Sequence, residues 1–317
     1  MSKVVLSEQN EQRSASYIMI AGPTASGKSK VALDLAKALG GEVINADSMQ
    51  LYADLSVLTA RPSLSDMEDV PHHLYGVVNG AHRASVGKWL ELAADAMMLV
   101  RSRGKLPIVI GGTGMYLEAA ISGIAPVPEV PAAIHEATKD LYQQIGGAAF
   151  WKQLAALDLP IAERIANGDS QRLIRAMSVI IATGIPLSAW QARDNKGALT
   201  GQALKLAILP SRDILYRRIN ERFNKMLDAG ALDEVRCLAV RDLDPSLPLM
   251  KALGLSALKS VLDGKMTMSE AGYISKRDSR HYAKRQMTWL RNNYNAKITI
   301  KTKLSERLIE NIISLIC

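Results

Sequence analysis

The stretch "GPTASGKS", residues 22–29, is the feature that most constrains how this chain can fold. It fits the pattern G-x-x-x-x-G-K-[ST] at every fixed letter, which here are Gly22, Gly27, Lys28 and Ser29. An apolar run at residues 17–22 precedes it, and the residues after it repeat apolar side chains at helical spacing. Such a loop between a strand and a helix points backbone N–H groups and the positive end of the helix dipole at anionic oxygens. We therefore expect residues 22–29 to bind a chain of phosphates.

Other parts of the sequence predict strands that alternate with helices. Short apolar runs occur at residues 42–46, 106–110 and 203–210, and amphipathic helical patterns separate the earlier strands. This alternation is typical of a parallel sheet covered by helices, in which ligands bind at the carboxyl ends of the strands. We therefore expect an α/β fold whose core is a P-loop NTPase-like parallel sheet. The turns after residues 21, 46 and 110 should lie along the same edge of that sheet.

A cluster of prolines marks a boundary in the chain. Three prolines occur between residues 126 and 131, and the pattern from residue 132 to about residue 190 is helical. We therefore expect an inserted all-helical subdomain over residues 126–197. The P-loop α/β core, with a helical C-terminal part, would then comprise residues 16–125 and 198–317.

The acidic residues of this chain do not lie where an ordinary P-loop NTPase or kinase has them. Such enzymes need a second acid for Mg²⁺, usually an aspartate that ends a buried strand. The strand at 106–110 ends instead in "GGTG", whereas Asp47 ends the strand at 42–46 and on the expected topology faces the phosphate loop. Asp47 could equally cap a following helix, with Gln50 completing a capping box, and spacing alone does not separate the two interpretations.

Two neighbouring motifs are less specific. The stretch "GGTGMY", residues 111–116, provides a backbone that a ligand can approach closely, and it places the hydroxyl of Thr113 at a strand end. His72 and His73 are adjacent in an extended stretch, so their side chains point in opposite directions, without a nearby Cys or third His. We expect these histidines to pack and form hydrogen bonds rather than to bind a metal.

Basic residues are concentrated near the end of a chain whose formal net charge is +8. Between residues 276 and 297, Lys and Arg side chains stand against one acid, Asp278, and aromatic residues are interleaved among them. Helical spacing places Lys276, Arg280 and Lys284 on one face. The stretch "QRLIR", residues 171–175, adds two more cations. A solvated helix face explains such stretches, but cations interleaved with aromatics on a basic protein favour an RNA backbone.

Composition excludes several classes of protein. At 317 residues and 48% hydrophobic, the chain can bury one large core or two modest ones, which excludes a disordered or fibrous protein. Two cysteines, Cys237 and Cys317, are too few for a disulfide framework or a Cys-rich metal site. Residues 1–16 lack the apolar core of a signal peptide, and no later run is long enough to span a membrane. We therefore expect a cytoplasmic protein without a membrane partner.

Taken together, the motifs closely resemble those of the tRNA dimethylallyltransferases, also called tRNA isopentenyltransferases. The resemblance runs in the same order from about Ile20 to Asn292 and rests on "GPTASGKS", "DSMQLY", "HHLYGV", "GGTGMYLEA", "DSQRLIRAMSVIIATGIPLS", "RINERFNKMLDAGALDEV" and "AKRQMTWLRN". It implies transfer of the five-carbon group of dimethylallyl diphosphate to the exocyclic N6 of the adenine next to the anticodon, with release of diphosphate. It also accounts for the missing second acid, because nothing attacks a γ-phosphate.

The resemblance implies roles for the residues around the phosphate loop. The loop would hold the diphosphate of dimethylallyl diphosphate rather than ATP, through Gly22, Pro23, Thr24, Ala25, Ser26, Gly27, Lys28 and Ser29. Asp47 matches the family's aspartate in D-S-x-Q and would accept the proton of the attacking amine. Arg222, with Arg218 in reserve, would stabilise the leaving diphosphate, so the catalytic residues are expected to be Asp47, Thr24 and Arg222. Mg²⁺ is the expected cofactor, with Ser29 as its protein ligand.

The same resemblance implies which residues contact the anticodon stem-loop of tRNA, the expected partner of a monomeric enzyme. In the core, these are Asp47, Ser48, Met49, Gln50, Thr113, Lys251, Arg280, Lys284 and Arg285, and the family places the whole stretches 251–256 and 279–286 at the tRNA. In the helical insertion, which would embrace the anticodon stem, they are His135, Gln171, Arg172, Leu173, Ile174 and Arg175.

The sequence departs from the family pattern in three places. Leu255 and Ser256 stand where a charged stretch is common, and His135 stands where an Arg is expected near the start of the insertion. In "LSVLTARP" Arg61 replaces the family's Lys, so the charge survives. These differences put the RNA contacts of Leu255, Ser256 and His135 in doubt.

Three alternative functions stay open at the level of the sequence. An adenylate isopentenyltransferase shares the loop motif and acts on a free nucleotide, and a P-loop kinase or NTPase uses the same loop for ATP. A non-catalytic RNA-binding protein with a relic loop is the third. The basic C-terminal stretch and the helical insertion favour tRNA over a free nucleotide.

Overall fold

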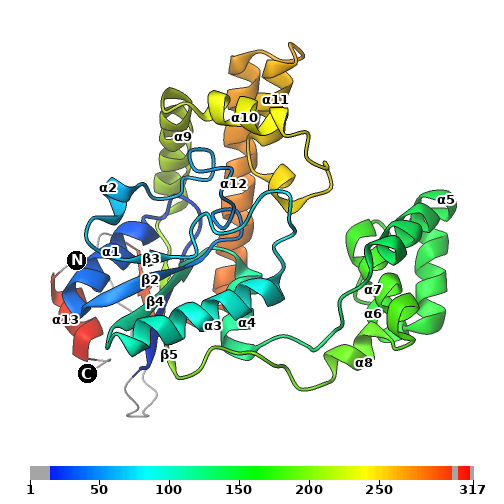
Figure 1. The fold of residues 1–317 in the computed structure, drawn as a ribbon, viewed down its shortest axis with the longest axis horizontal. Coiled ribbons are helices and arrows are strands. Elements are labelled where there is room, and N and C mark those ends of the chain that lie inside the picture. Colours follow the sequence, from blue (N-terminus) through cyan, green and yellow to red (C-terminus); the bar gives the residue numbers. More distant parts are fainter. Residues whose placement is uncertain (1–14, 302–305, 315–317) are drawn as a thin grey trace. The chain divides into compact units, whose positions relative to one another are not determined.

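The computed structural model describes residues 15–301 and 306–314 (Figure 1). The chain divides into two compact units. The larger comprises the described residues up to Ile121 and those from Leu199 onward, and the smaller comprises Ser122–Ala198. The helical insertion that we predict at 126–197 falls within the smaller unit.

The larger unit is built around a six-stranded sheet with the strand order β3-β2-β4-β1-β5-β6. Every pair of neighbouring strands is parallel, as the alternation of strand and helix patterns predicts. The strands are β1 (Tyr17–Ala21), β2 (Gly41–Ala46), β3 (His72–His73), β4 (Leu106–Gly111), β5 (Ala203–Ile208) and β6 (Ile298–Ile300). The expected α/β class is therefore confirmed, and β1 leads directly into the loop at residues 22–29.

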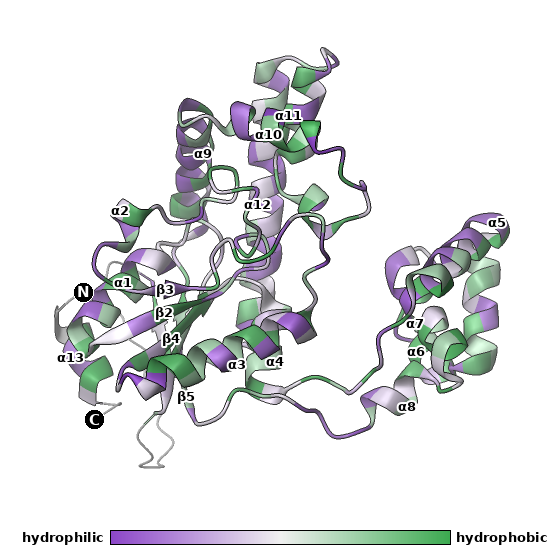
Figure 2. Ribbon diagram, viewed as in Figure 1, coloured by the Kyte–Doolittle hydropathy of each residue, from purple (hydrophilic) through white to green (hydrophobic). Residues whose placement is uncertain are grey.

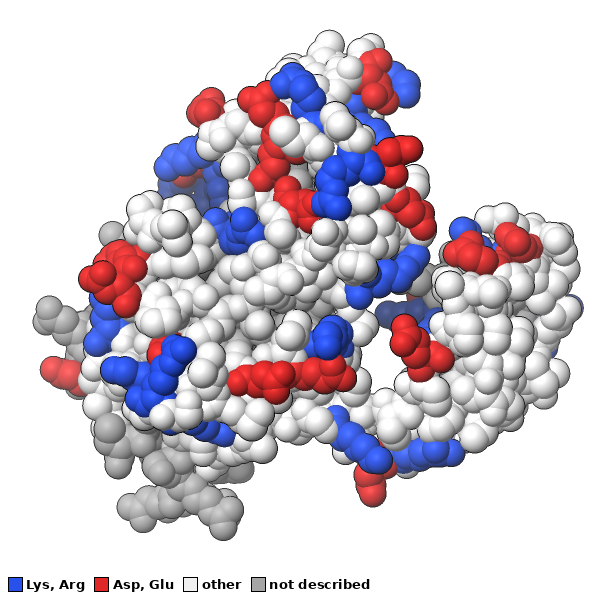
Figure 3. Space-filling model, in the orientation of Figure 1, with Lys and Arg blue, Asp and Glu red and all other residues white. Residues whose placement is uncertain are grey.

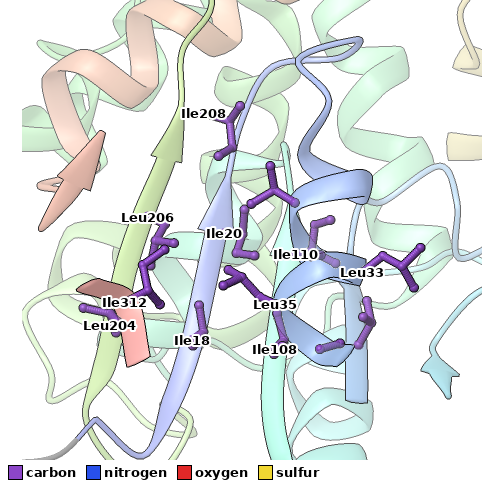
Figure 4. Packing of buried hydrophobic residues seen from close by; sticks show 14 of the residues in the cluster. Ile18, Ile20, Leu33, Leu35, Ile108, Ile110, Leu204, Leu206, Ile208 and Ile312 are labelled. Carbon is purple, nitrogen blue, oxygen red and sulfur yellow. The ribbon is translucent and has the colours of Figure 1, made fainter. Parts of the chain in front are cut away.

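The helix after that loop packs on the sheet and forms the main core of the larger unit. Helix α1 (Lys28–Leu39) buries Leu35 on its apolar face and ends where Gly40 adopts a left-handed φ of 63°. This face contacts side chains of the central strands, among them Ile20 and Ile110 (Figure 4). The central strands are largely hydrophobic in Figure 2, as expected for a parallel sheet that is covered on both faces.

The remaining helices of the larger unit lie beside the sheet and along the C-terminal part of the chain. A second apolar core forms among α9, α10, α11 and the loop after β2, and α12 packs against both α9 and α11. The bounds of these helices are α2 (Leu64–Met67), α3 (Val86–Ser102), α4 (Gly114–Ser122), α9 (Arg212–Asp228), α10 (Ala231–Val240), the 3₁₀ helix η1 (Pro248–Lys251), α11 (Leu255–Leu262), α12 (Met268–Asn293) and α13 (Glu306–Ser314).

The smaller unit is helical and has its own apolar core. Its helices are α5 (Ala132–Leu157), α6 (Leu159–Ala162), α7 (Ser170–Thr183) and α8 (Leu187–Gln191). Helix α5 is interrupted at Gly146, where φ is 74°, and its second half packs on α7 through Phe150 and Leu154. Among the residues that the structure describes, no helix is long and apolar enough to cross a membrane.

Candidate active site at the edge of the sheet

Three loops from different strands meet at the carboxyl edge of the sheet. The N–H of Gly22, after β1, donates to the carbonyl of Gly111 at the end of β4 over 3.2 Å. The N–H of Ser48, after β2, donates to Oγ1 of Thr113 over 3.1 Å. The turns after residues 21, 46 and 110 therefore lie along one edge, as the sequence predicts.

The loop at residues 22–29 has the backbone conformation that an anion-binding turn requires. Ala25 and Gly27 both adopt left-handed φ values, of 60° and 92°, so that Gly27 caps the N-terminus of α1. Lys28 follows directly, and burial lowers the pKa of its ammonium group. The neighbouring charge of Arg222 also lowers this pKa, whereas Asp47 opposes the shift. A bound anion would offset the cost of this buried cation.

Asp47 is held in place by a buried asparagine at the end of β2. Its N–H donates to Oδ1 of Asn45 over 2.9 Å, and the amide nitrogen of Asn45 donates back to the Asp47 carbonyl over 3.1 Å. Asn45 is only 1% exposed, and the indole of Trp89 donates to its carbonyl over 2.8 Å. Asp47 is therefore fixed by its own backbone, with its carboxylate within electrostatic reach of Lys28.

The carboxylate of Asp47 influences several other side chains that are fully or partly buried. Burial lowers the pKa of Arg222, and the charge of Asp47 opposes that shift. Burial raises the pKa of Tyr75, Tyr116 and Tyr282, and the charge of Asp47 adds to the rise in each case. The negative charge of Asp47 thus lies at the centre of a site that contains two cations and three tyrosines.

The capping-box interpretation of Asp47 and Gln50 is wrong. The stretch from residue 47 to residue 63 contains turns and no helix. Asp47 accepts a hydrogen bond from the N–H of Met49 over 3.0 Å, which is a local turn. The side chain of Gln50 donates instead to the carbonyls of Thr59 and Ala60, over 3.0 and 2.9 Å. Gln50 therefore stabilises the following loop.

Two arginines of α9 reach the loop at residues 22–29. Arg222 donates to Oγ1 of Thr24, and Arg218 donates to the carbonyl of Ser26 over 3.1 Å. The structure thus brings Thr24, Arg222 and the reserve candidate Arg218 into contact around one loop. A guanidinium in this place can form charge-assisted hydrogen bonds with an anion at the loop.

A cavity of about 650 Å³ opens beside the start of α1. It is lined by Ser29 and Arg222 and by three further cations, Lys30, Arg61 and Lys225. The loop that carries Arg61 is held from α10, because the carboxylate of Glu234 accepts the N–H groups of residues 56–58. The cavity is also lined by Asp66 and Glu68, so four cations and two acids surround the start of α1 at Ser29.

Gln286 is the last residue of the stretch 279–286 that the resemblance places at the tRNA, but its side chain faces the loops of the site. It lies on α12 and is 6% exposed. Its amide oxygen accepts the N–H of Thr24 over 2.8 Å, and its amide nitrogen donates to the carbonyl of Gly112 over 2.8 Å. The available signal was a polar side chain on the buried face of an amphipathic helix, where an unpaired amide would be costly.

The basic residues on α12 that the resemblance places at the tRNA lie at least partly at the protein surface. Lys284 and Arg285 are exposed and line a groove of about 570 Å³ together with Trp289. Arg280 donates to Oδ1 of Asn220 on α9 over 2.8 Å, and Lys251 is exposed in η1. On the face shown in Figure 3, a group of Lys and Arg side chains lies over α9, while acidic side chains are interspersed elsewhere.

The predicted tRNA-contacting residues of the smaller unit divide into exposed and buried ones. Gln171, Arg172 and Arg175 are exposed on α7, and His135 is half-buried on α5. Leu173 and Ile174 face the core of the unit instead, with 0% and 8% exposure. Their side chains anchor the helix, because helical spacing turns them away from the exposed face that carries the cations.

The histidines at positions 72 and 73 form hydrogen bonds within the protein. Nδ1 of His72 lies 2.8 Å from the carbonyl of Val70, and Nε2 of His73 lies 2.7 Å from Oε2 of Glu42. These contacts agree with the packing role that the sequence predicts. Within residues 15–301 and 306–314, no group of three or more His, Cys, Asp or Glu could hold a metal ion.

Comparison with known proteins gives two family matches. The family described as "IPP transferase" matches residues 50–293, and the family described as "Isopentenyl transferase" matches residues 15–75. Together these matches cover the three loops of the site and α12.

Individual relatives agree with the family matches. The tRNA dimethylallyltransferase of Parvibaculum lavamentivorans is 46% identical over 299 residues, which is 94% of this chain and 95% of the relative. The enzyme of the same name from Rhodopseudomonas palustris is 47% identical over 286 residues, covering 90% of this chain and 89% of the relative.

Solved structures give the same result. A tRNA isopentenylpyrophosphate transferase of Bacillus halodurans has a TM-score of 0.68 at 32% identity, covering 95% of both chains. A eukaryotic dimethylallyltransferase acting on tRNA has a TM-score of 0.75 at 27% identity, covering 87% of this chain and 70% of that one.

Proposed function

The chain belongs to the tRNA dimethylallyltransferase family, and we propose that it transfers the dimethylallyl group of dimethylallyl diphosphate to N6 of the adenine next to the anticodon of tRNA. One observation carries this proposal: the loop after Asp47 and the loop of Thr24 and Lys28 meet at one edge of the sheet, where Arg222 also reaches Thr24. A proton acceptor thus lies beside an anion-binding loop, which is what transfer from a diphosphate to an amine requires.

The loop side of the site supports binding and departure of diphosphate. The exocyclic nitrogen attacks C1 of the dimethylallyl group, and the C1–O bond breaks with its electron pair passing to the diphosphate. Negative charge therefore grows on the leaving group. We propose that the loop amides, Lys28 and Arg222 stabilise that charge, and partial burial of both cations reduces the screening of their charge by water.

The opposite side of the site supports removal of the proton. An adenine amino group is a weak nucleophile because its lone pair is conjugated with the ring, so a carboxylate within hydrogen-bond reach is needed to accept its proton. Asp47 is the candidate. Its backbone is fixed by Asn45, so its side chain is oriented before the adenine arrives.

The target adenine has to leave the stack of the anticodon loop to reach Asp47. Extrusion of a base costs about a few kcal/mol of unstacking energy, which further contacts to the RNA must offset. We propose that Ser48, Gln50 and Thr113 guide the base and that Lys284 and Arg285 contact the RNA backbone. In the smaller unit, the exposed side chains of Gln171, Arg172 and Arg175 are the proposed contacts to the anticodon stem.

Mg²⁺ is the proposed cofactor, and the residues present fit it. Magnesium keeps several waters and is held largely by substrate phosphates, and the Ser or Thr that ends the G-x-x-x-x-G-K-[ST] pattern supplies a hydroxyl ligand. Ser29 fits this role because it is exposed in the first turn of α1 and lines the basic cavity. When bound, the ion would neutralise charge on the diphosphate.

The alternatives fit less well. A P-loop kinase would need an acid after β4, where this chain has Gly112 and Thr113. An adenylate isopentenyltransferase would not use a basic α12 or an inserted helical unit, and the full-length relatives act on tRNA by name. We also propose a monomer that works in the cytoplasm, where its tRNA substrate is found.

Incubation with labelled dimethylallyl diphosphate tests the proposed function. The protein is mixed with Mg²⁺ and either unmodified tRNA or AMP, and the position of the label is determined after digestion to nucleosides. We expect label on N6 of the adenosine next to the anticodon. Label on AMP in the absence of tRNA would instead establish an adenylate isopentenyltransferase.

A further inference from the structure

Gln286 connects two loops that lie far apart in the sequence. Its amide oxygen accepts the N–H of Thr24, and its amide nitrogen donates to the carbonyl of Gly112, both over 2.8 Å. The side chain is 6% exposed, so both ends of the amide are used within the protein. Gln286 differs in this respect from Lys284 and Arg285, whose side chains on the same helix are exposed to solvent.

The two loops that Gln286 joins are in close contact with each other. A Cβ atom at Gly112 would lie 2.4 Å from the amide nitrogen of Gln286 and 2.9 Å from the carbonyl oxygen of Gly22. Gly22 also donates to the carbonyl of Gly111 over 3.2 Å. The glycine at position 112 therefore makes room for the amide, and the distance between the loops is fixed by backbone contacts.

Each loop carries a different half of the proposed chemistry. Thr24 belongs to the diphosphate loop, and its hydroxyl accepts a hydrogen bond from Arg222. On the other loop, Thr113 accepts the N–H of Ser48, the residue that follows Asp47. The amide of Gln286 thus lies between the leaving-group side and the proton-accepting side of the site.

The register of α12 makes this connection possible. Gly114 packs against the ring of Trp289, since a Cβ atom there would lie 2.6 Å from the ring. Trp289 and Gln286 are three positions apart and therefore share a face of the helix. The Thr24 N–H needs an acceptor and the Gly112 carbonyl needs a donor. Only a side chain as long as glutamine that carries both groups can bind the two at once.

We propose that Gln286 is a positioning residue that holds the diphosphate loop and the Asp47 side of the site in register for transfer. This inference rests on the proposed function. It assigns Gln286 no contact with tRNA, whereas Lys284 and Arg285 keep that role. Its consequence is that loss of the amide should slow the transfer step and leave tRNA affinity unchanged.

Three variants test the proposal in the full-length protein. Gln286→Leu removes the donor and the acceptor. Gln286→Glu keeps the shape and the acceptor for Thr24, but the ionised carboxylate cannot donate to Gly112. Val100→Ala is the control for lost packing, because Val100 is buried in α3 near its C-terminal end, remote in the fold from the loops. The measurements are the single-turnover transfer rate at saturating substrates, the tRNA dissociation constant and the unfolding temperature.

The expected result is a loss of rate without a loss of affinity. Gln286→Leu should lower the single-turnover rate by about 10²-fold, since small displacements of reacting groups cost this much. Gln286→Glu should also fall below the native rate, because its charged oxygen would face the Gly112 carbonyl, and this near-isosteric variant decides the question if Gln286→Leu fails to fold. Val100→Ala should transfer at the native rate below its unfolding temperature. The tRNA dissociation constant should stay within about twofold for all three.

Two results would overturn the inference. A tRNA dissociation constant raised about tenfold with an unchanged rate at saturation would make Gln286 a tRNA contact. A native rate in both Gln286 variants would show that the amide does not position the loops. If the native protein itself fails to modify tRNA, the proposed function falls instead, so the two failures are distinguishable.

Discussion

The guanidinium of Arg222 donates a hydrogen bond to Oγ1 of Thr24, which ties α9 to the loop at residues 22–29. Arg218, one helical turn earlier, donates to the carbonyl of Ser26 over 3.1 Å. Partial burial lowers the pKa of Arg222, so water screens its positive charge less than that of a fully exposed side chain. In the proposed function, Arg222 and Lys28 would therefore act on the diphosphate from two different elements of the fold.

Replacement of Arg222 tests this arrangement. Arg222→Met should lower kcat by about 10²-fold or more, because it removes a cation that stabilises developing negative charge. Arg222→Lys should restore only part of the rate, since a point charge does not reproduce the planar fork. Steady-state kinetics with varied dimethylallyl diphosphate checks both. Arg217→Met on the exposed face of α9 is the control, and an equal loss there would contradict the role of Arg222.

Lys28 should lower the stability of the protein when no anion is bound. Burial lowers its folded-state pKa, so the protonated form is disfavoured in the fold. Because the group is a base, this cost applies at neutral pH and falls as pH rises toward the unfolded pKa of about 10.4. Lys28→Met should therefore raise the unfolding temperature at pH 7 and raise it by a smaller amount at pH 9. It should also abolish the stabilisation that inorganic diphosphate gives to the native protein. Thermal unfolding at both pH values, with and without diphosphate, checks this, and a lower unfolding temperature for Lys28→Met would contradict it.

The glycines offer a matched pair of substitutions. Gly112→Ala should lower the free energy of unfolding by about 1–3 kcal/mol and slow transfer, because the added Cβ would press on Gln286 and the Gly22 carbonyl. Gly272→Ala lies inside α12, where an added Cβ would meet nothing within 4 Å. It should raise the free energy of unfolding by about 0.5–1 kcal/mol and leave transfer unchanged. Urea denaturation gives both values, and equal effects would contradict the contact at Gly112.

Much of the larger unit could be predicted because its signals are local. The loop at residues 22–29 is a contiguous pattern, and the parallel strands around it are short apolar runs between helical patterns. The meeting of Asp47 with this loop followed from topology, since the carboxyl ends of parallel strands share one edge. The edge strands β3 and β6 were not predicted, because two or three residues carry too little periodicity.

Other parts of the site depend on contacts between distant segments, which a single sequence does not reveal. Gln286 accepts a backbone N–H that lies 262 positions earlier. Glu234, on α10, accepts the N–H groups of residues 56–58, which lie in the loop after β2. The capping-box interpretation of Gln50 was wrong because the carbonyls of Thr59 and Ala60 take its side chain instead. In each case a long-range hydrogen bond decides the role of a polar side chain.

The central claim is that Asp47 accepts the proton of the adenine amine beside the diphosphate loop. Its most direct test is the single-turnover rate of Asp47→Asn with saturating tRNA and dimethylallyl diphosphate, measured together with the tRNA dissociation constant. Asn keeps the size of the side chain but is a far weaker proton acceptor. We predict a rate lowered by about 10²-fold or more with tRNA affinity unchanged. A native transfer rate for Asp47→Asn would contradict the account.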